Sequence, residues 1–153
     1  MRIEPIWRCR EWIPVIARWH WDEWGHADPG GSLEAWTTGL QERTAVNAIP
    51  TTYVAIADDG VAIGSVVLVA NDMETHPELS PWLAGLYVSA AHRRSGVGSA
   101  LARHAMDRCI EMGVERLYLH TSSATSLYKR LGWKVLSREL YEGQQVDVME
   151  YGA

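Results

Sequence analysis

The fold is decided by the stretch Leu86-Tyr87-Val88-Ser89-Ala90-Ala91-His92-Arg93-Arg94-Ser95-Gly96-Val97-Gly98-Ser99-Ala100-Leu101. An apolar strand leads into a loop with two arginines and two glycines, and the loop continues as a helix. N–H groups in a glycine-containing turn form a concave set of donors, and the first N–H groups of a helix have no partner within it. The helix dipole favours negative charge at the same point, and arginine suits phosphate oxygens. The stretch therefore predicts a phosphate-binding site.

Two other phosphate-binding motifs fit the stretch less well. The Walker loop requires G-x-x-x-x-G-K-[ST], which the sequence lacks. The dinucleotide fingerprint G-x-G-x-x-G/A would place Leu101 at its third small position, and the repeated βαβ units of that fold are missing. A nucleotide-dependent oxidoreductase is therefore the least favoured of the functions considered for this chain, and we expect no binding of NAD(P).

Hydrophobic periodicity over the whole chain predicts a mixed α/β fold of three layers, a central sheet with helices on both faces. Strands are expected over residues 2–7, 52–57, 61–70, 82–89, 114–120, 133–140 and 145–151. Helices are expected over residues 11–24, 33–40 and 97–112, and in a short segment that ends at residue 130. Ser32 is the expected cap of the second helix, and Ser122 or Ser123 that of the last. Asp58-Asp59-Gly60 predicts a hairpin between the second and third strands.

Length, composition and charge narrow the class of protein. The 153 residues suit one domain over 1–153, and 47% apolar with 22% charged residues is typical of soluble globular proteins. Cys9 and Cys109 form neither a disulfide framework nor a metal-ligand spacing. We find no secretory signal and no apolar run long enough to span a membrane, so we expect a cytoplasmic protein without membrane or metal binding. The net charge of −5 argues against a nucleic-acid partner.

Arg93-x-x-Gly96-x-Gly98 and Tyr128-x-x-x-Gly132-Trp133, taken together, resemble motifs of the GNAT superfamily of acetyltransferases. Arg93-x-x-Gly96-x-Gly98 matches the acetyl-CoA signature R/Q-x-x-G-x-G/A. Downstream, Tyr128-Lys129-Arg130-Leu131-Gly132-Trp133 matches Y-x-x-x-G-F/W/Y, and Ala124 is the small residue that commonly precedes the tyrosine. The resemblance runs from about residue 54 to residue 148. It implies the three-layer α-β-α GNAT fold with a mostly antiparallel sheet, acetyl-CoA as co-substrate, and no metal.

The resemblance implies roles for the signature stretch. The residues expected to bind coenzyme A are Leu86, Tyr87, Val88, Arg93, Arg94, Ser95, Gly96, Val97, Gly98, Ser99, Thr121 and Ala124. The N–H groups of residues 94–99 would hold the pyrophosphate. The main chain of Leu86 and Val88 would pair with the pantetheine arm, and an N–H near Leu86 could polarise the thioester carbonyl as an oxyanion donor. The alternative is an ordinary surface turn with two solvated arginines.

Proton transfer needs an acid and a base. Tyr128 would be the acid that protonates the leaving thiolate, a role that typically contributes about 10²–10⁴-fold; otherwise it is an ordinary amphipathic tyrosine. The amine must lose a proton because the pKa of an alkyl ammonium is about 10. His120, at the end of the strand beside the signature strand, is the first candidate base. Glu74, His76 and Glu78 are second choices, and each of them is otherwise a solvated polar residue.

The family pattern is not fully met. An Asn is common where this chain has Thr121, and a Glu is common near Ala84. These departures leave the identity of the base open. They also favour the main alternative function, a non-catalytic acyl-CoA sensor on the same fold, whereas Tyr128 argues for a catalyst. The favoured function is an N-acetyltransferase in which the amine attacks the thioester directly, through a tetrahedral intermediate.

Tryptophan is unusually frequent near the N-terminus. The chain has eight tryptophans and no phenylalanine, and five of the eight lie in the first 24 residues. Trp21, Trp24 and Trp36, with Glu74, are candidates for the acceptor pocket, because aromatic faces attract ammonium groups; the alternative is that the tryptophans fill the core. The acceptor itself, a small amine, an amino sugar, a polyamine or a peptide, is not predicted. In the family, a closing strand such as 145–151 often pairs across a dimer, so the resemblance is compatible with a homodimer.

Overall fold

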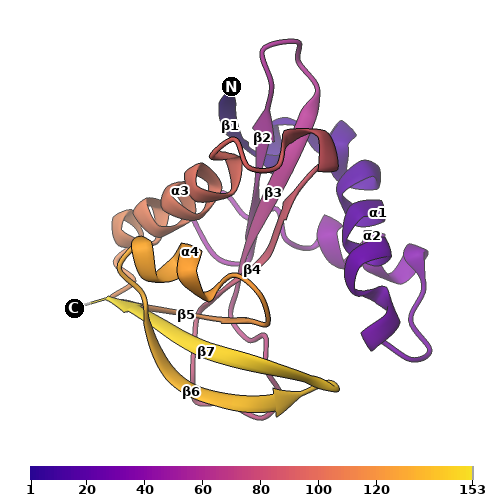
Figure 1. The fold of residues 1–153 in the computed structure, drawn as a ribbon. Coiled ribbons are helices and arrows are strands. Elements are labelled where there is room, and N and C mark those ends of the chain that lie inside the picture. Colours follow the sequence, from indigo (N-terminus) through magenta and orange to yellow (C-terminus); the bar gives the residue numbers. More distant parts are fainter. Residues whose placement is uncertain (153) are drawn as a thin grey trace.

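The computed structural model describes residues 1–152 and shows a seven-stranded sheet with helices on both faces (Figure 1). The strands are β1 (Arg2–Pro5), β2 (Thr51–Ile56), β3 (Ala62–Val69), β4 (Trp82–Val88), β5 (Arg116–Thr121), β6 (Lys134–Tyr141) and β7 (Gln144–Gly152). The helices are α1 (Ile13–Trp24), α2 (Leu33–Gln41), α3 (Val97–Glu111) and α4 (Thr125–Arg130). Short 3₁₀ turns are η1 (Ile6–Arg8), η2 (Arg10–Trp12), η3 (Gly25–Ala27) and η4 (Ala90–His92). This order of elements confirms the predicted fold class.

Several predicted boundaries shift for identifiable reasons. The strand expected from residue 114 begins at Arg116, because the Val114 N–H donates to the Cys109 carbonyl at 2.9 Å and closes the end of α3. Ser32 caps α2 as predicted, and its hydroxyl accepts from the Ala35 N–H at 3.0 Å. The serine cap expected for α4 was wrong. Residues 122 and 123 precede an Ala124 cap position, and the Thr121 hydroxyl accepts from the Ala124 N–H at 2.9 Å instead.

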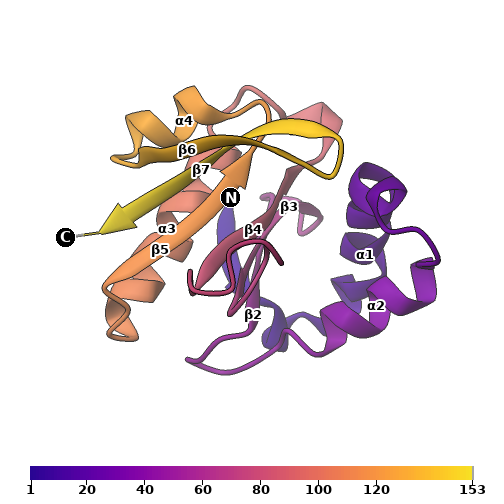
Figure 2. The same ribbon diagram turned by 90° about the horizontal axis from the view of Figure 1, so that it is seen from below.

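The two faces of the sheet carry separate apolar cores. Figure 2 shows α1 and α2 on one side of the sheet and α3 and α4 on the other. The α3 face buries residues of α3 spaced three or four apart, among them Leu101, Ala105 and Cys109, against β2 and β3. The α1 face buries Ile13 and Ile16 of α1 with Leu40 of α2. Burial of one such leucine or isoleucine contributes roughly 1.5–3 kcal/mol, so these faces fix the helices on the sheet.

The sheet is weakly joined at its centre. Its strand order is β1-β2-β3-β4-β5-β7-β6, and every neighbouring pair is antiparallel except β4 and β5. Within residues 1–152, that parallel pair is registered at one position, Trp82 opposite Tyr118. Beyond it the two strands diverge, and β1–β4 and β5–β7 cross in different directions (Figure 1).

A β-bulge at Gly85 bends β4 where it leaves β5. Between Ser65 and Val67 of β3, the partner positions on β4 move from Tyr87 to Ala84, so β4 carries one extra residue. Gly85 has a φ of +56°, and a Cβ there would lie 2.9 Å from Val67 Cγ2. Glycine is therefore required at the bulge by both conformation and space.

Candidate functional site

The loop before α3 presents unpaired main-chain donors. Arg94 and Gly96 have φ values of +62° and +85°, which turn the chain sharply into the helix. Gly96 is the N-cap of α3 and no side chain caps the helix there. The first helical hydrogen bond runs from the Ala100 N–H to the Gly96 carbonyl at 3.0 Å, so the N–H groups of residues 97–99 have no partner within the helix. These donors and the helix dipole point toward one place, which suits an anion.

The two arginines of the loop differ in their surroundings. Arg93 Nε donates to the Val88 carbonyl at 2.9 Å, and its guanidinium lies 5.4 Å from the centre of the Tyr87 ring. The side chain of Arg93 therefore folds back onto β4. Arg94 is exposed, and Ser95 donates its hydroxyl proton to the His92 carbonyl within the loop.

The other residues expected to bind coenzyme A gather at the carboxyl ends of β4 and β5. Leu86 and Val88 are half-buried and pack on the α3 face, whereas Tyr87 points to the opposite face. Thr121 ends β5 and Ala124 begins the turn into α4. Because β4 and β5 are parallel neighbours, both ends lie at the same edge of the sheet, beside the start of α3.

Tyr128 lies in the core between α4 and the sheet. Its side chain is 5% exposed, and its ring lies 5.8 Å from the Trp133 ring in an edge arrangement. Burial raises the pKa of Tyr128 and is the only cause of the shift, with no hydrogen-bond partner contributing among the described residues. The phenol therefore holds its proton at neutral pH, which is the state that can donate.

His120 is paired with a carboxylate. Its Nε2 lies 3.1 Å from Asp72 Oδ2, and its ring packs edge-on against Trp82 and Tyr141 at 6.2 and 5.4 Å between ring centres. Among the described residues, the carboxylate lies on the Nε2 side of the ring, so Nδ1 is the candidate acceptor of a proton. Asp72 was missed from the sequence, because one Asp in a polar loop gives no signal of its partner.

The second-choice bases lie in a different environment. His76 Nε2 lies 2.8 Å from Glu139 Oε1, and its Nδ1 lies 3.1 Å from Glu78 Oε1. Hydrogen bonds to Glu78 and Glu139 raise the pKa of His76, so more of the ring is already protonated and less of it is available as a base. Glu74 is exposed in the same loop. The pair between His76 and Glu139 ties this loop to β6.

The tryptophans of α1 divide into two groups. Trp19 stacks on Tyr87 of β4 at 5.3 Å between ring centres, and Trp24 meets the same ring edge-on at 6.4 Å. Trp21 instead meets Trp36 of α2 edge-on at 5.8 Å, and Trp36 Nε1 donates to Asp28 Oδ2 at 2.7 Å. Of the three tryptophans predicted for the acceptor pocket, the structure brings Trp24 to β4. Trp19 was missed because its spacing matched the apolar face of the helix.

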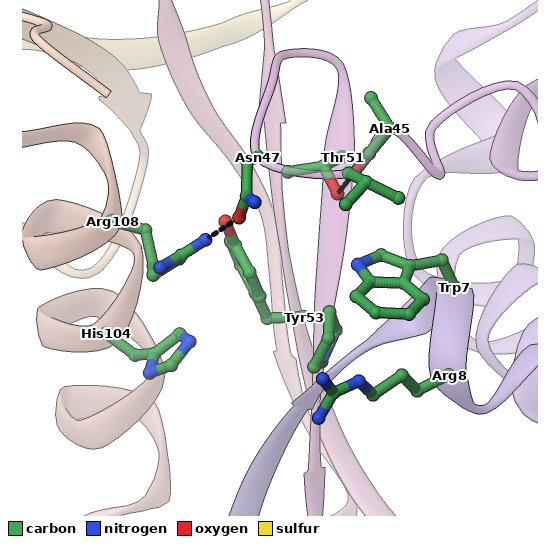
Figure 3. Close-up of a pocket in the computed structure, with 10 residues that line it drawn as sticks. Trp7, Arg8, Ala45, Asn47, Thr51, Tyr53, His104 and Arg108 are labelled. Atoms are coloured by element: carbon green, nitrogen blue, oxygen red, sulfur yellow. Dashed lines mark hydrogen bonds between the residues drawn. The ribbon is translucent and has the colours of Figure 1, made fainter. Parts of the chain in front are cut away.

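A separate hollow of about 400 Å³ lies between α3 and residues 5–8 of the N-terminal segment (Figure 3). Its polar and aromatic lining includes Trp7, Arg8, Asn47, Tyr53, His104 and Arg108. Arg108 donates to the Asn47 side chain across it (Figure 3). His104 is seven residues after Val97, about 10 Å along the helix, so this hollow lies apart from the loop at the start of α3.

Over residues 1–152, no group of three or more His, Cys, Asp or Glu side chains is placed to hold a metal ion. In the same part of the chain, no helix has both the length and the apolar character that a membrane crossing requires.

Comparisons with known proteins agree with this geometry. A sequence profile described as the acetyltransferase (GNAT) family matches residues 13–133, whereas no protein in a search of curated sequences matches significantly. Among solved structures, an aminoglycoside 6'-N-acetyltransferase complexed with coenzyme A aligns with a TM-score of 0.77 at 14% identity, over 99% of this chain and 97% of that one. A chimeric spermidine N-acetyltransferase from Vibrio cholerae and hSSAT aligns with a TM-score of 0.74 at 18% identity, over 99% and 94%. At such identities the structural likeness establishes the fold, and the profile establishes the family. The chain therefore belongs to the GNAT family of acetyltransferases.

Proposed function

We propose that this chain acts as a single-domain N-acetyltransferase that moves the acetyl group of acetyl-CoA to a primary amine. The observation that carries the proposal is the uncapped start of α3, with its positive-φ turn at Arg94 and Gly96, next to the divergence of β4 and β5. Main-chain donors there suit a pyrophosphate, and the free edge of β4 suits an extended chain with amide groups. Acetyl-CoA has both features.

The side chains divide the proton transfers between them. The ammonium form of the acceptor gives one proton to Nδ1 of His120, which Asp72 orients, and His120 passes it to bulk water. The neutral amine nitrogen then forms a bond to the thioester carbon, and the negative charge that develops on oxygen is stabilised by the Leu86 N–H. As the C–S bond breaks, Tyr128 donates its proton to the sulfur, and the second proton of the nitrogen restores the phenol through solvent. The products are an amide and a free thiol.

Burial of Tyr128 is compatible with this role. Low polarity around the phenol disfavours its anion, and the same surroundings disfavour a thiolate anion. The proton-transfer step therefore exchanges one disfavoured anion for another. Because burial destabilises both the phenolate and the thiolate, the two effects partly cancel, and the raised pKa of Tyr128 opposes proton donation to sulfur only in part.

The acceptor that best fits the opposite face is a cationic amine. Trp24 and Tyr87 offer aromatic faces beside β4. Asp72, Glu74 and Glu139 add carboxylates from the loop of residues 71–81 and from β6. Aromatic rings and carboxylates both attract ammonium groups. Aminoglycosides and spermidine, which are named for two proteins of the same fold, have this chemistry.

An assay of thiol release tests the proposal. Purified protein is mixed with acetyl-CoA and with spermidine, an aminoglycoside, a lysine-containing peptide or a neutral aromatic amine, and free thiol is followed. We expect turnover with at least one cationic amine, and micromolar binding of acetyl-CoA by isothermal titration with no binding of NADH or ATP. Binding without turnover on any amine would favour the acyl-CoA sensor. Absence of acetyl-CoA binding would overturn the proposal.

A further inference from the structure

A buried polar cluster lies directly behind the bulge of β4. His20 of α1 and Ser65 of β3 are 5% and 0% exposed. His20 Nε2 lies 2.8 Å from the Ser65 hydroxyl oxygen, and the Ser65 hydroxyl donates to the Gly85 carbonyl at 3.1 Å. Burial of a polar pair inside an apolar helix–sheet interface costs free energy of folding unless the polar groups are hydrogen-bonded. Among the described residues, the carbonyl of the bulge is the one main-chain group that both side chains reach.

The chain of hydrogen bonds fixes the state of the histidine. A serine hydroxyl has a single proton, and here that proton goes to the Gly85 carbonyl. The Ser65 oxygen must then accept from His20, so Nε2 of His20 carries a proton. Burial first, and then the charge of Arg43, lower the pKa of His20 to about 4. The ring is therefore neutral, with a defined tautomer, and acts as a donor toward the bulge.

The direction of one carbonyl decides the direction of the next N–H. The peptide bond between Gly85 and Leu86 is trans, because the cis bonds of the chain precede Pro50 and Pro81. In a trans peptide, the C=O and N–H groups point in opposite directions. Since Ser65 holds the Gly85 carbonyl toward β3 and α1, the Leu86 N–H faces away from β3, toward the gap where β4 leaves β5.

We infer that His20 and Ser65 are positioning residues. They hold the Gly85–Leu86 peptide in the orientation in which the Leu86 N–H polarises the thioester carbonyl. The inference rests on the proposed function, and it adds the side chains that aim the donor. Gly85 completes the device, because a Cβ there would lie 3.1 Å from His20 Cε1 and 2.9 Å from Val67 Cγ2. The oxyanion donor is thus set from the α1 face, by residues that do not touch the substrate.

Variants of His20 and Ser65 distinguish a role in orienting the Leu86 N–H from a role in core packing. Ser65→Ala removes both hydrogen bonds of the cluster, and His20→Met removes the one between His20 and Ser65. His20→Gln keeps an N–H donor in place of the ring N–H. Thr52→Val is the matched control, because Thr52 is also fully buried and its hydroxyl donates to the Arg43 carbonyl at 3.0 Å, away from β4. Thermal melting identifies the folded variants, and His20→Gln against His20→Met keeps the test available if Ser65→Ala does not fold.

The direct readout is the carbonyl stretch of bound acetyl-CoA labelled with ¹³C at the thioester carbon, measured by isotope-edited infrared spectroscopy. In the wild type we expect the band to move to lower frequency on binding. The shift should fall by about half or more in Ser65→Ala and His20→Met, and should be retained in His20→Gln and Thr52→Val. We also expect kcat to fall about 10–100-fold in the first two, somewhat less than for complete loss of an oxyanion donor, while the Kd for acetyl-CoA changes less than about twofold.

The outcomes distinguish this inference from the proposed function. A wild-type band that shifts, with the same shift and kcat in folded Ser65→Ala and His20→Met, would overturn the positioning role and leave the acetyltransferase standing. If the wild type does not bind acetyl-CoA at all, the proposed function fails and the inference fails with it. Equal losses in His20→Gln and His20→Met would also contradict the inference, because a donor would then make no difference.

Discussion

The two sides of β4 present different kinds of chemistry. On the α3 side, the candidate coenzyme site consists of main-chain N–H groups held by the φ angles of Arg94 and Gly96 and by the start of a helix. On the opposite side, the candidate acceptor site consists of side chains that come from distant segments, such as Trp24, Asp72 and His120. The first kind of site depends on local sequence, and the second depends on how the whole chain folds.

This difference explains what a single sequence can reveal. A main-chain site is written in consecutive residues, so the loop could be predicted from the glycines at 96 and 98. A side-chain site has no such record, and the pairing of residue 72 with residue 120 exists only in the folded sheet. Substitutions that change the backbone conformation should therefore affect the coenzyme site most, and substitutions of single side chains should affect the acceptor site most.

Tyr128 is a side chain on the coenzyme side, so its substitution tests whether that side acts through the main chain alone. Tyr128→Phe should lower kcat about 100-fold or more, since the leaving sulfur loses its acid, while the Kd for acetyl-CoA stays within about twofold. Steady-state kinetics and titration calorimetry measure both. Tyr118→Phe removes the hydroxyl of another buried tyrosine as a control. Full activity in Tyr128→Phe would show that Tyr128 is not the acid and that the coenzyme side acts through its main-chain groups.

A backbone substitution at the loop sharpens the comparison. Gly96→Val places a β-branched residue at a φ of +85° and should raise the Kd for acetyl-CoA about 50-fold, through roughly 1–3 kcal/mol of strain. Gly113→Val is the matched control at the other end of α3, where φ is +80° and a Cβ also meets nothing within 4 Å. It should lower stability by a similar amount and leave the Kd unchanged. Equal effects on the Kd would mean that helix stability, not the loop, controls binding.

The polar interior of the α1 face should appear in the pH dependence of stability. The pKa of His20 is about 4 in the folded protein and about 6.5 in the unfolded chain. The unfolded state therefore takes up a proton first as the pH falls, and stability decreases below pH 6.5. Between pH 7 and pH 5 the loss is about 2 kcal/mol. Urea unfolding measures it, and His20→Gln should flatten the dependence; an unchanged slope would show that other groups cause it.

The smallest effect tests the acceptor side. His120→Gln should lower kcat/KM about tenfold near pH 7, and the loss should shrink at high pH, where more of the amine is neutral before it binds. A pH–rate profile for the wild type and the variant gives both values. His76→Gln is the control, because it removes the contact with Glu139 but not the candidate base. Parallel profiles for His120→Gln and the wild type would exclude proton transfer by His120.

Much of the fold could be predicted, and the errors have local causes. Alternating, helical or continuous apolar spacing predicted every strand and helix in the right order, because each element buries at least one face. The cap of α4 was wrong because the Thr121 hydroxyl, at a strand end, reaches the turn before either serine can. The bulge at Gly85 was missed, since a glycine in an apolar strand does not reveal which side chains hold its carbonyl. His20 could not be linked to Ser65 without the packing of α1 on β3.

The single registered position between β4 and β5 also divides the sheet into two plates, β1–β4 and β5–β7, which are paired in the described chain at Trp82 and Tyr118. A molecule that bridges the plates would hinder their separation, so amide hydrogen exchange in β4 and β5 should slow in excess acetyl-CoA. Exchange at the β6–β7 turn around Gly143 should not change. Bound acetyl-CoA would then hold the two plates together, and unfolding would become more cooperative while it is bound.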